Sequence, residues 1–228
     1  MSRVQASDRS LLPKLDPTLY LVTDPHLGGG QPLVEIVAAA VAGGVTLVQL
    51  RDKEADGRVM LEQARALKAL LDPAGVPLLI NDRIDIALAA GAAGCHVGQT
   101  DLPVEAARAL LGPDAILGTS LDAIEQARAA DPEYLDYVAY GPFAATATKG
   151  DAGPPIGAAG LVAVRALTAL PLVAIGGVGE ANLGDAILAG ADGIAVVFAI
   201  MAAADPAAAS RRLRTAIDAA RKQREEGA

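Results

Sequence analysis

Short apolar runs alternate along the chain with Ala- and Leu-rich segments whose apolar residues have helical spacing. The apolar runs are rich in β-branched residues and recur at intervals of roughly 20 to 35 residues, which is typical of strands that alternate with helices. The pattern predicts strands at 19–23, 47–50, 77–80, 94–97, 115–118, 137–140, 172–175 and 193–197. It predicts helices at 32–42, 57–71, 84–90, 103–111, 121–130, 158–167, 181–188 and 206–224.

Glycine follows many of the predicted helices, as at Gly43, Gly91 and Gly190, where it allows the left-handed conformation that ends a helix. Strands that alternate with helices form a parallel sheet, and eight such units predict a single (βα)8 TIM barrel over residues 17–220. Residues 1–16 and 221–228 are expected to be tails. A doubly wound open sheet is the alternative, although no GxGxxG follows the first strand.

Composition indicates one folded domain with an aliphatic core. Hydrophobic residues make up 52% of the chain, aromatic residues only 3%, and Trp is absent. The net charge of −8 argues against a nucleic-acid partner, which requires a basic face. Cys95 is the only cysteine, so no intrachain disulfide forms. Residues 1–15 lack the apolar centre of a secretion signal and no apolar run reaches ~20 residues, so we expect a cytoplasmic protein without a membrane span.

Two carboxylates follow neighbouring predicted strands. Asp82 follows the strand at 77–80, and Asp101 follows the strand at 94–97. In a barrel both would reach the same rim, where two carboxylates, phosphate oxygens and water can hold Mg²⁺. Taken singly, each aspartate is better explained as a cap of the helix that follows it. The residues alone leave both roles open.

Polar and cationic residues follow other predicted strands. Strand alternation directs Gln49, Arg51 and Lys53 the same way, which suits a pyrophosphate, although the two cations could also be solvated loop charges. Ser120, after the fifth strand, could bind a ligand or cap a helix. His96 lies within a strand and is expected to be structural, since the chain shows no nucleophile that would pair with it.

A second anion site is expected on the other side of the barrel mouth. The loop 141–157 after the sixth strand supplies Thr146, Thr148 and Lys149. Barrels often hold a phosphate on backbone N–H groups after strands seven and eight, which places Gly176, Gly177, Val197 and Phe198 as candidates. Two anion sites at one mouth indicate that two small phosphorylated substrates meet there.

The motifs in this order resemble those of the thiamine-phosphate synthase family over residues 18–204. They are Tyr20-Leu21-Val22-Thr23-Asp24, the segment 44–53 that ends in Gln49-Leu50-Arg51-Asp52-Lys53, Ile80-Asn81-Asp82-Arg83, Gly98-Gln99-Thr100-Asp101, Thr146-Ala147-Thr148-Lys149, Asp151-Ala152-Gly153-Pro154-Pro155 and Ala174-Ile175-Gly176-Gly177. The resemblance implies that a pyrimidinylmethyl pyrophosphate is coupled to a thiazole phosphate by a dissociative displacement that releases pyrophosphate. It leaves open whether the chain forms a homo-oligomer.

The resemblance also implies roles for individual residues. Lys149, Arg51, Lys53 and Ser120 would be catalytic; the pyrimidine pyrophosphate would contact Gln49, Arg51, Lys53, Asn81, Ser120 and Lys149. Mg²⁺ would be held by Asp82 and Asp101. The thiazole phosphate would be held by Thr146, Thr148, Gly176, Gly177, Val197 and Phe198.

Three positions depart from the family pattern. Ala144-Ala145 replace a Phe-Pro pair, Phe198 replaces a common Ser, and Leu121-Asp122 follow Ser120 where a His is frequent. These departures keep a second interpretation open, in which the chain is a thiazole-tautomerase-like or regulatory paralogue on the same barrel without coupling activity.

Overall fold

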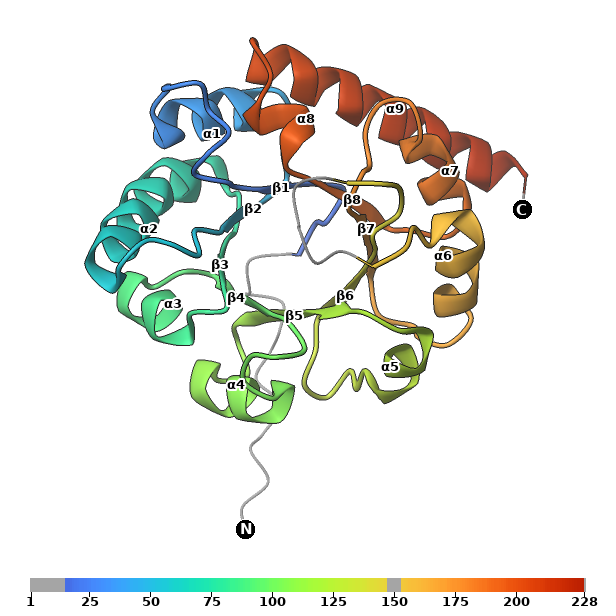
Figure 1. Ribbon diagram of the computed structural model, residues 1–228, viewed down its shortest axis with the longest axis horizontal. Coiled ribbons are helices and arrows are strands. Elements are labelled where there is room, and N and C mark those ends of the chain that lie inside the picture. The colour runs from blue at the N-terminus through green and yellow to red at the C-terminus, as the bar shows by residue number, and fades with distance from the viewer. Residues whose placement is uncertain (1–14, 147–152, 228) are drawn as a thin grey trace.

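The eight strands form one closed barrel. The computed structural model describes residues 15–146 and 153–227. Each strand runs parallel to its neighbours in chain order, and β1 (Leu19–Val22) also pairs with β8 (Gly193–Val196), so the sheet has no free edge (Figure 1). The predicted (βα)8 TIM barrel is therefore confirmed, and the open doubly wound sheet is excluded.

The remaining strands lie close to their predicted positions. They are β2 (Leu47–Leu50), β3 (Leu78–Asn81), β4 (Gly94–Val97), β5 (Ile116–Leu121), β6 (Tyr137–Tyr140) and β7 (Leu172–Ile175). Only β5 differs much, because its pairing with β6 continues through Ser120 and Leu121. Ser120 is therefore a strand residue rather than a loop residue.

The helices cover the outside of the barrel as a ring (Figure 1). They are α1 (Leu33–Ala42), α2 (Gly57–Leu71), the short 3₁₀ helix η2 (Asp72–Ala74), α3 (Ile84–Ala90), α4 (Val104–Leu111), α5 (Ile124–Ala129), α6 (Gly157–Arg165), α7 (Leu183–Leu188), α8 (Phe198–Met201) and α9 (Pro206–Glu226). The four-residue α8 was not predicted, because so short a helix shows no periodicity. Over the described part of the chain, no helix combines the length and apolarity needed to cross a membrane.

Side chains of the strands alternate between two apolar cores. The larger core lies between the strands and the helices. The smaller core fills the barrel and consists of Tyr20, Val22, Leu47, Leu79, Ile116, Tyr137, Ala139, Val173 and Ala195. The core is aliphatic as predicted, except that the ring hydroxyls of Tyr20 and Tyr137 bring polar groups into the barrel interior.

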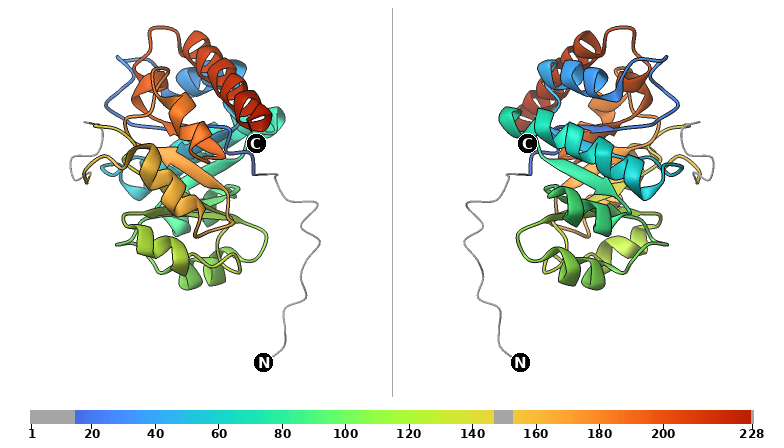
Figure 2. Two further views of the ribbon diagram at one scale, coloured as in Figure 1. Left: turned by 90° about the vertical axis from the view of Figure 1, so that its right-hand side faces the viewer. Right: turned by 90° about the vertical axis from the view of Figure 1, so that its left-hand side faces the viewer.

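The C-terminal helix packs against the outer ring of helices along its whole length. Residues 221–228 were expected to be a tail, but α9 continues through Glu226. Arg221 donates to the Asp192 carbonyl, and Arg224 donates to the carbonyls of Ile187 and Ala191, so these two guanidinium groups fasten the helix end to the α7–β8 region. Figure 2 shows α9 in red crossing the outside of the molecule beside α1.

Candidate active site

Most of the predicted site residues gather at the carboxyl ends of the strands, as the fold requires. Gln49 and Asn81 lie near the carboxyl ends of β2 and β3 and are 3% and 8% exposed. They belong to the layer of the barrel interior nearest these ends, which we call the upper layer. Asp82 follows β3 directly, and Asp101 lies in the loop after β4. The structure therefore places the two predicted metal ligands on neighbouring strand ends.

Asp82 has a strained backbone. Its φ of 61° is the only positive φ at a non-glycine residue among those described. Two tight turns enclose it, because the Arg83 N–H bonds to the Asn81 carbonyl at 2.6 Å and the Ile84 N–H bonds to the Asp82 carbonyl at 3.2 Å. Its own N–H bonds to the His96 carbonyl of β4 at 2.8 Å. Such strain costs about 1–3 kcal/mol and is typical of functional sites, which favours a ligand-binding role for this carboxylate.

Neither aspartate caps a helix through its side chain. The residues at the cap positions of α3 and α4 are Arg83 and Pro103, and neither helix receives a side-chain cap. Asp101 instead accepts a hydrogen bond from the Gly98 N–H at 2.7 Å, which closes its loop. The capping alternative is therefore wrong for both aspartates.

The two carboxylates share one electrostatic environment. The pKa of Asp82 is raised from 3.8 to about 6, chiefly by burial. The hydrogen bond to Asp101 and the charge of Asp101 also raise this pKa, whereas Lys53 lowers it. The Lys53 ammonium lies 3.5 Å from an Asp82 carboxylate oxygen. A partly buried carboxylate whose ionisation is opposed by a neighbouring carboxylate is a site that a cation would stabilise.

The residues present fit a Mg²⁺ ion. No group of three or more His, Cys, Asp or Glu side chains occurs among residues 15–146 and 153–227, so a cation here would have two protein carboxylates. Mg²⁺ commonly uses one or two carboxylates and completes its octahedron with water and substrate phosphate oxygens. The donor set of Asp82 and Asp101 therefore suits a metal that is shared with a phosphorylated substrate.

Arg51 and Lys53 reach the same rim but turn to opposite neighbours. Arg51 lies 3.8 Å from the buried Asp24, which follows β1, and its N–H bonds to the Thr23 hydroxyl at 2.9 Å. Lys53 turns toward Asp82 after β3. The predicted convergence of the two cations on one point is therefore not seen in the protein alone. Sequence reasoning did not assign Asp24 a role in the site.

A chain of buried polar side chains crosses the barrel interior and was not predicted. The Gln49 amide donates to the Tyr20 hydroxyl, which lies 2.9 Å from the Tyr137 hydroxyl. Tyr137 in turn lies 2.7 Å from His96 Nδ1, and His96 Nε2 lies 2.9 Å from the Ser120 hydroxyl. The predicted ligand contacts Gln49 and Ser120 are thus the two ends of one chain.

His96 is neutral in this chain. Burial lowers the pKa of its imidazole from 6.5 to about 4, so the ring carries one N–H donor and one acceptor at neutral pH. His96 was expected to be structural, and its burial with both ring nitrogens hydrogen-bonded agrees with that expectation. Its partners were not predicted, although alternation in the strands directs Tyr20, His96 and Tyr137 into the barrel.

The glycines after β7 have a structural role in addition to the expected one, which stays a prediction. Gly176 and Gly177 have φ of 82° and 66°, and a Cβ on Gly177 would lie 2.5 Å from the Ala144 carbonyl oxygen. The Ala144 N–H bonds to the Gly176 carbonyl at 3.0 Å. The two glycines therefore let the loop after β6 dock against the loop after β7, which brings the chain toward Thr146 to this side of the mouth.

The remaining thiazole-side candidates are distributed as follows. Val197 follows β8, and Phe198 begins α8 with 64% of its side chain exposed. Thr148 and Lys149 lie outside the described residues.

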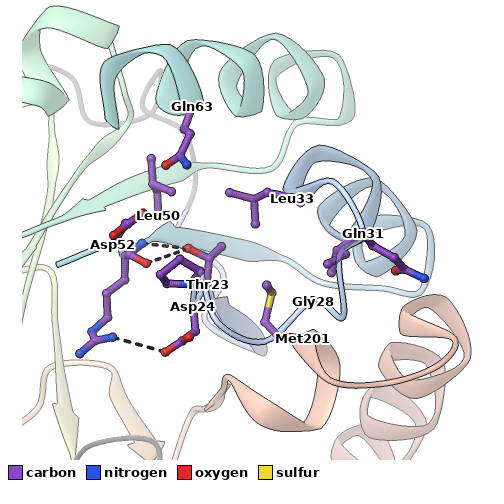
Figure 3. Close-up of a pocket in the computed structure, with 12 residues that line it drawn as sticks. Thr23, Asp24, Gly28, Gln31, Leu33, Leu50, Asp52, Gln63 and Met201 are labelled. Carbon is purple, nitrogen blue, oxygen red and sulfur yellow. Dashed lines mark hydrogen bonds and ion pairs between the residues drawn. The ribbon is translucent and has the colours of Figure 1, made fainter. Parts of the chain in front are cut away.

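A small hollow adjoins the Arg51 side of the rim. It has a volume of about 160 Å³ and is lined by residues of β2, α2, α8 and the segment from Thr23 to Ile36. Figure 3 shows Gln63 projecting into it from α2, opposite Met201 of α8. Gln63 Oε1 is buried there without a hydrogen-bond partner among the described residues. The hollow has room for a few water molecules, one of which could satisfy this oxygen.

A closed barrel that gathers carboxylates and cations at the carboxyl ends of its strands has the architecture of a TIM-barrel enzyme. Comparison with known proteins narrows this class. Residues 19–200 match the family model described as thiamine monophosphate synthase. The chain therefore belongs to the thiamine monophosphate synthase family, and this membership makes it a transferase of thiamine biosynthesis.

Individual relatives agree with the family model. The thiamine-phosphate synthase of Xanthobacter autotrophicus is 57% identical over 211 residues, which cover 92% of this chain and 100% of the relative. That of Azorhizobium caulinodans is 53% identical over 207 residues, which cover 91% and 98%. A solved thiamine phosphate pyrophosphorylase from Pyrococcus furiosus aligns with a TM-score of 0.82 at 35% identity, covering 90% of this chain and 97% of that one.

The raised pKa of Asp82 predicts a pH-dependent stability of the metal-free protein. Between pH 3.8 and about 6 the folded state holds a proton that the unfolded state has released, so the free energy of unfolding falls as the pH rises through this window. An Asp82→Asn variant lacks this titration. We expect the difference in unfolding free energy, wild type minus variant, to decrease from pH 4 to pH 6 in urea titrations with chelator present.

Asp85→Asn is the matched control. Asp85 is exposed and paired with Arg83, which lowers the pKa of its carboxyl, so its difference from wild type should rise slightly near pH 4 and then level off, opposite in sign to that of Asp82. A constant or rising difference for Asp82→Asn would contradict the shared environment of Asp82 and Asp101.

Proposed function

We propose that the protein couples 4-amino-2-methyl-5-(diphosphooxymethyl)pyrimidine to a thiazole phosphate, giving thiamine phosphate and pyrophosphate. The observation that carries this proposal is the cluster of Lys53, Asp82 and Asp101 at one rim of the barrel, with Lys53 and Asp82 3.5 Å apart. The family membership supports the same reaction. The cytoplasm, where such biosynthetic enzymes act, is the location we propose.

The pyrophosphate end of the first substrate would lie over β2, β3 and β4. Asp82 and Asp101 would hold Mg²⁺, which supplies positive charge to the pyrophosphate oxygens when it is bound. Lys53 is already at this cluster and would move from Asp82 to the pyrophosphate. Arg51, held by Asp24 at 3.8 Å, and Lys149 would complete the set of cations.

The pyrimidine ring would lie deeper, over the upper layer of the barrel. Gln49, Asn81 and Ser120 supply hydrogen-bonding groups at this depth. Polar groups placed in a largely buried site orient a ligand more than they add affinity. These side chains would therefore hold the exocyclic methylene carbon toward the thiazole side.

The thiazole phosphate would occupy the opposite side of the mouth. Thr146 and Thr148 would supply hydroxyls, and Gly176, Gly177, Val197 and Phe198 would supply backbone groups. The reaction would begin with cleavage of the bond between the methylene carbon and the pyrophosphate oxygen, which keeps the electron pair. The thiazole nitrogen would then donate its lone pair to the methylene carbon. No protein nucleophile is needed, and preorganised charge would supply most of the acceleration.

Replacement of Asp82 tests the pyrophosphate site. We expect Asp82→Asn to lower kcat/KM for the coupling by about 100-fold or more, because charge stabilisation of the leaving group is lost. The measurement is thiamine phosphate formation from both substrates with Mg²⁺ present. The exposed Asp85, three residues along the chain, is the control, and Asp85→Asn should retain activity within about twofold.

Full activity of Asp82→Asn would refute the proposed role of this carboxylate. A wild-type protein that isomerises the thiazole phosphate without coupling it would instead favour the tautomerase-like paralogue.

The thiazole side gives a second test. If backbone groups hold the phosphate, Phe198→Ser should change the KM for the thiazole phosphate by less than about threefold, because the Phe198 side chain is largely exposed. Gly177→Ala should raise this KM by about tenfold or more, because the substitution forces the backbone out of its positive φ. Gly179→Ala, at a position with open space around it, is the control and should resemble wild type. A large effect of Phe198→Ser would show that the side chain matters.

A further inference from the structure

The buried chain from Gln49 to Ser120 joins five strands through side chains alone. Its members come from β2, β1, β6, β4 and β5, in the order Gln49, Tyr20, Tyr137, His96 and Ser120. Tyr20 and Tyr137 are 1% and 0% exposed, and His96 is 6% exposed. Polar groups at this depth are costly unless each hydrogen bond is made, so the chain has few acceptable arrangements.

One arrangement satisfies every buried hydrogen. If His96 Nε2 carries the proton, it donates to Ser120, and Nδ1 accepts from the Tyr137 hydroxyl. The Tyr137 oxygen then accepts from Tyr20, whose oxygen accepts from the Gln49 amide, as the structure places it. Every donor along the chain then points the same way, from Gln49 toward Ser120.

The other tautomer reverses the chain and leaves a defect. His96 Nδ1–H would donate to Tyr137, and Tyr137 would donate to the Tyr20 oxygen. The Tyr20 hydrogen would then lack an acceptor unless the Gln49 amide turned over. The His96 tautomer and the face of the Gln49 amide are therefore coupled across the barrel, although the two side chains do not touch.

The outer ends of the chain face the ligand site. Gln49 Oε1 accepts no hydrogen bond from a described residue and is not fully enclosed, so it is available to accept one from a ligand. In the satisfied arrangement Ser120 accepts from His96, which leaves the Ser120 hydroxyl hydrogen to donate outward. The site then offers an acceptor at Gln49 and a donor at Ser120.

We infer that Tyr20, Tyr137 and His96 are positioning residues that set this donor and acceptor pattern and so make the site specific for an amino-substituted heteroaromatic ring. An aminopyrimidine has an N–H donor beside a ring-nitrogen acceptor, which complements the pattern. The inference rests on the proposed function for the identity of the ring. Gly118 makes room for the Tyr137 ring in this chain of hydrogen bonds, because a Cβ there would lie 2.0 Å from the ring.

Binding of two probes to the Mg²⁺-supplemented protein tests the inference. The first probe is 4-amino-2-methyl-5-(diphosphooxymethyl)pyrimidine, and the second is its 4-oxo analogue, which has nearly the same shape but a carbonyl acceptor beside a ring N–H donor. Calorimetry without thiazole phosphate gives both dissociation constants. We expect wild type to prefer the amino probe by about 100-fold or more, because a site built to hydrogen-bond one pattern rejects the other.

Tyr137→Phe removes one hydroxyl and interrupts the chain. We expect the preference for the amino probe to fall at least about tenfold, because Gln49 and Ser120 can then adopt either orientation. Tyr20→Phe interrupts the chain beside Gln49 and should lower the preference as well. Tyr140→Phe is the matched control, since it removes the hydroxyl of a buried tyrosine in the same strand on the helix-facing side, and its preference should equal that of wild type.

The outcomes separate the inference from the proposed function. If wild type binds neither probe, the proposed function fails and the inference fails with it. If wild type prefers the amino probe and both Tyr variants keep that preference, the inference alone is overturned. Equal weakening of both probes overturns it too, because that is the effect of a merely structural role. Circular dichroism checks folding, and Tyr20→Phe decides the matter if Tyr137→Phe does not fold.

Discussion

Closure of the barrel is the constraint on which the rest of this structure depends. Because β1 pairs with both β2 and β8, all eight carboxyl ends meet around one small opening. Residues far apart in sequence, such as Lys53, Asp82 and Asp101, are brought together there with no contribution from a second domain. Closure also encloses a space narrow enough for Gln49 and Ser120 to be linked by three intervening side chains.

The rim has charge interactions that remain unfavourable in the protein alone. Asp82 combines a positive φ, partial burial and a neighbouring carboxylate, each of which costs free energy. Lys53 offsets part of this cost, but it is 59% exposed and can leave. The protein has a net charge of −8, yet Arg51 and Lys53 both lie at this rim of the barrel. A bound cation would relieve the unfavourable interaction between Asp82 and Asp101.

Much of the fold was predictable because the period of the apolar pattern and the helix-ending glycines report local structure directly. The strand at 94–97 and the helices at 57–71 and 84–90 have the predicted bounds. The rim positions of Asp82 and Asp101 followed from closure. That neither aspartate caps a helix could not be predicted, because capping depends on the turn geometry at Arg83 and Pro103. The chain through His96 was not predicted either, since it requires side-chain contacts between five strands that no local pattern records. The length of β5 was missed for a similar reason, because pairing with β6 extends it.

The central claim is that Asp82 and Asp101 form a cation site that operates together with a pyrophosphate group. Calorimetric titration with inorganic pyrophosphate, with and without Mg²⁺, tests it most directly. The account predicts that Mg²⁺ tightens pyrophosphate binding by about 100-fold or more and that Asp101→Asn abolishes this gain. Equal affinity of the wild-type protein with and without Mg²⁺ would contradict it, as would an unchanged gain in Asp101→Asn.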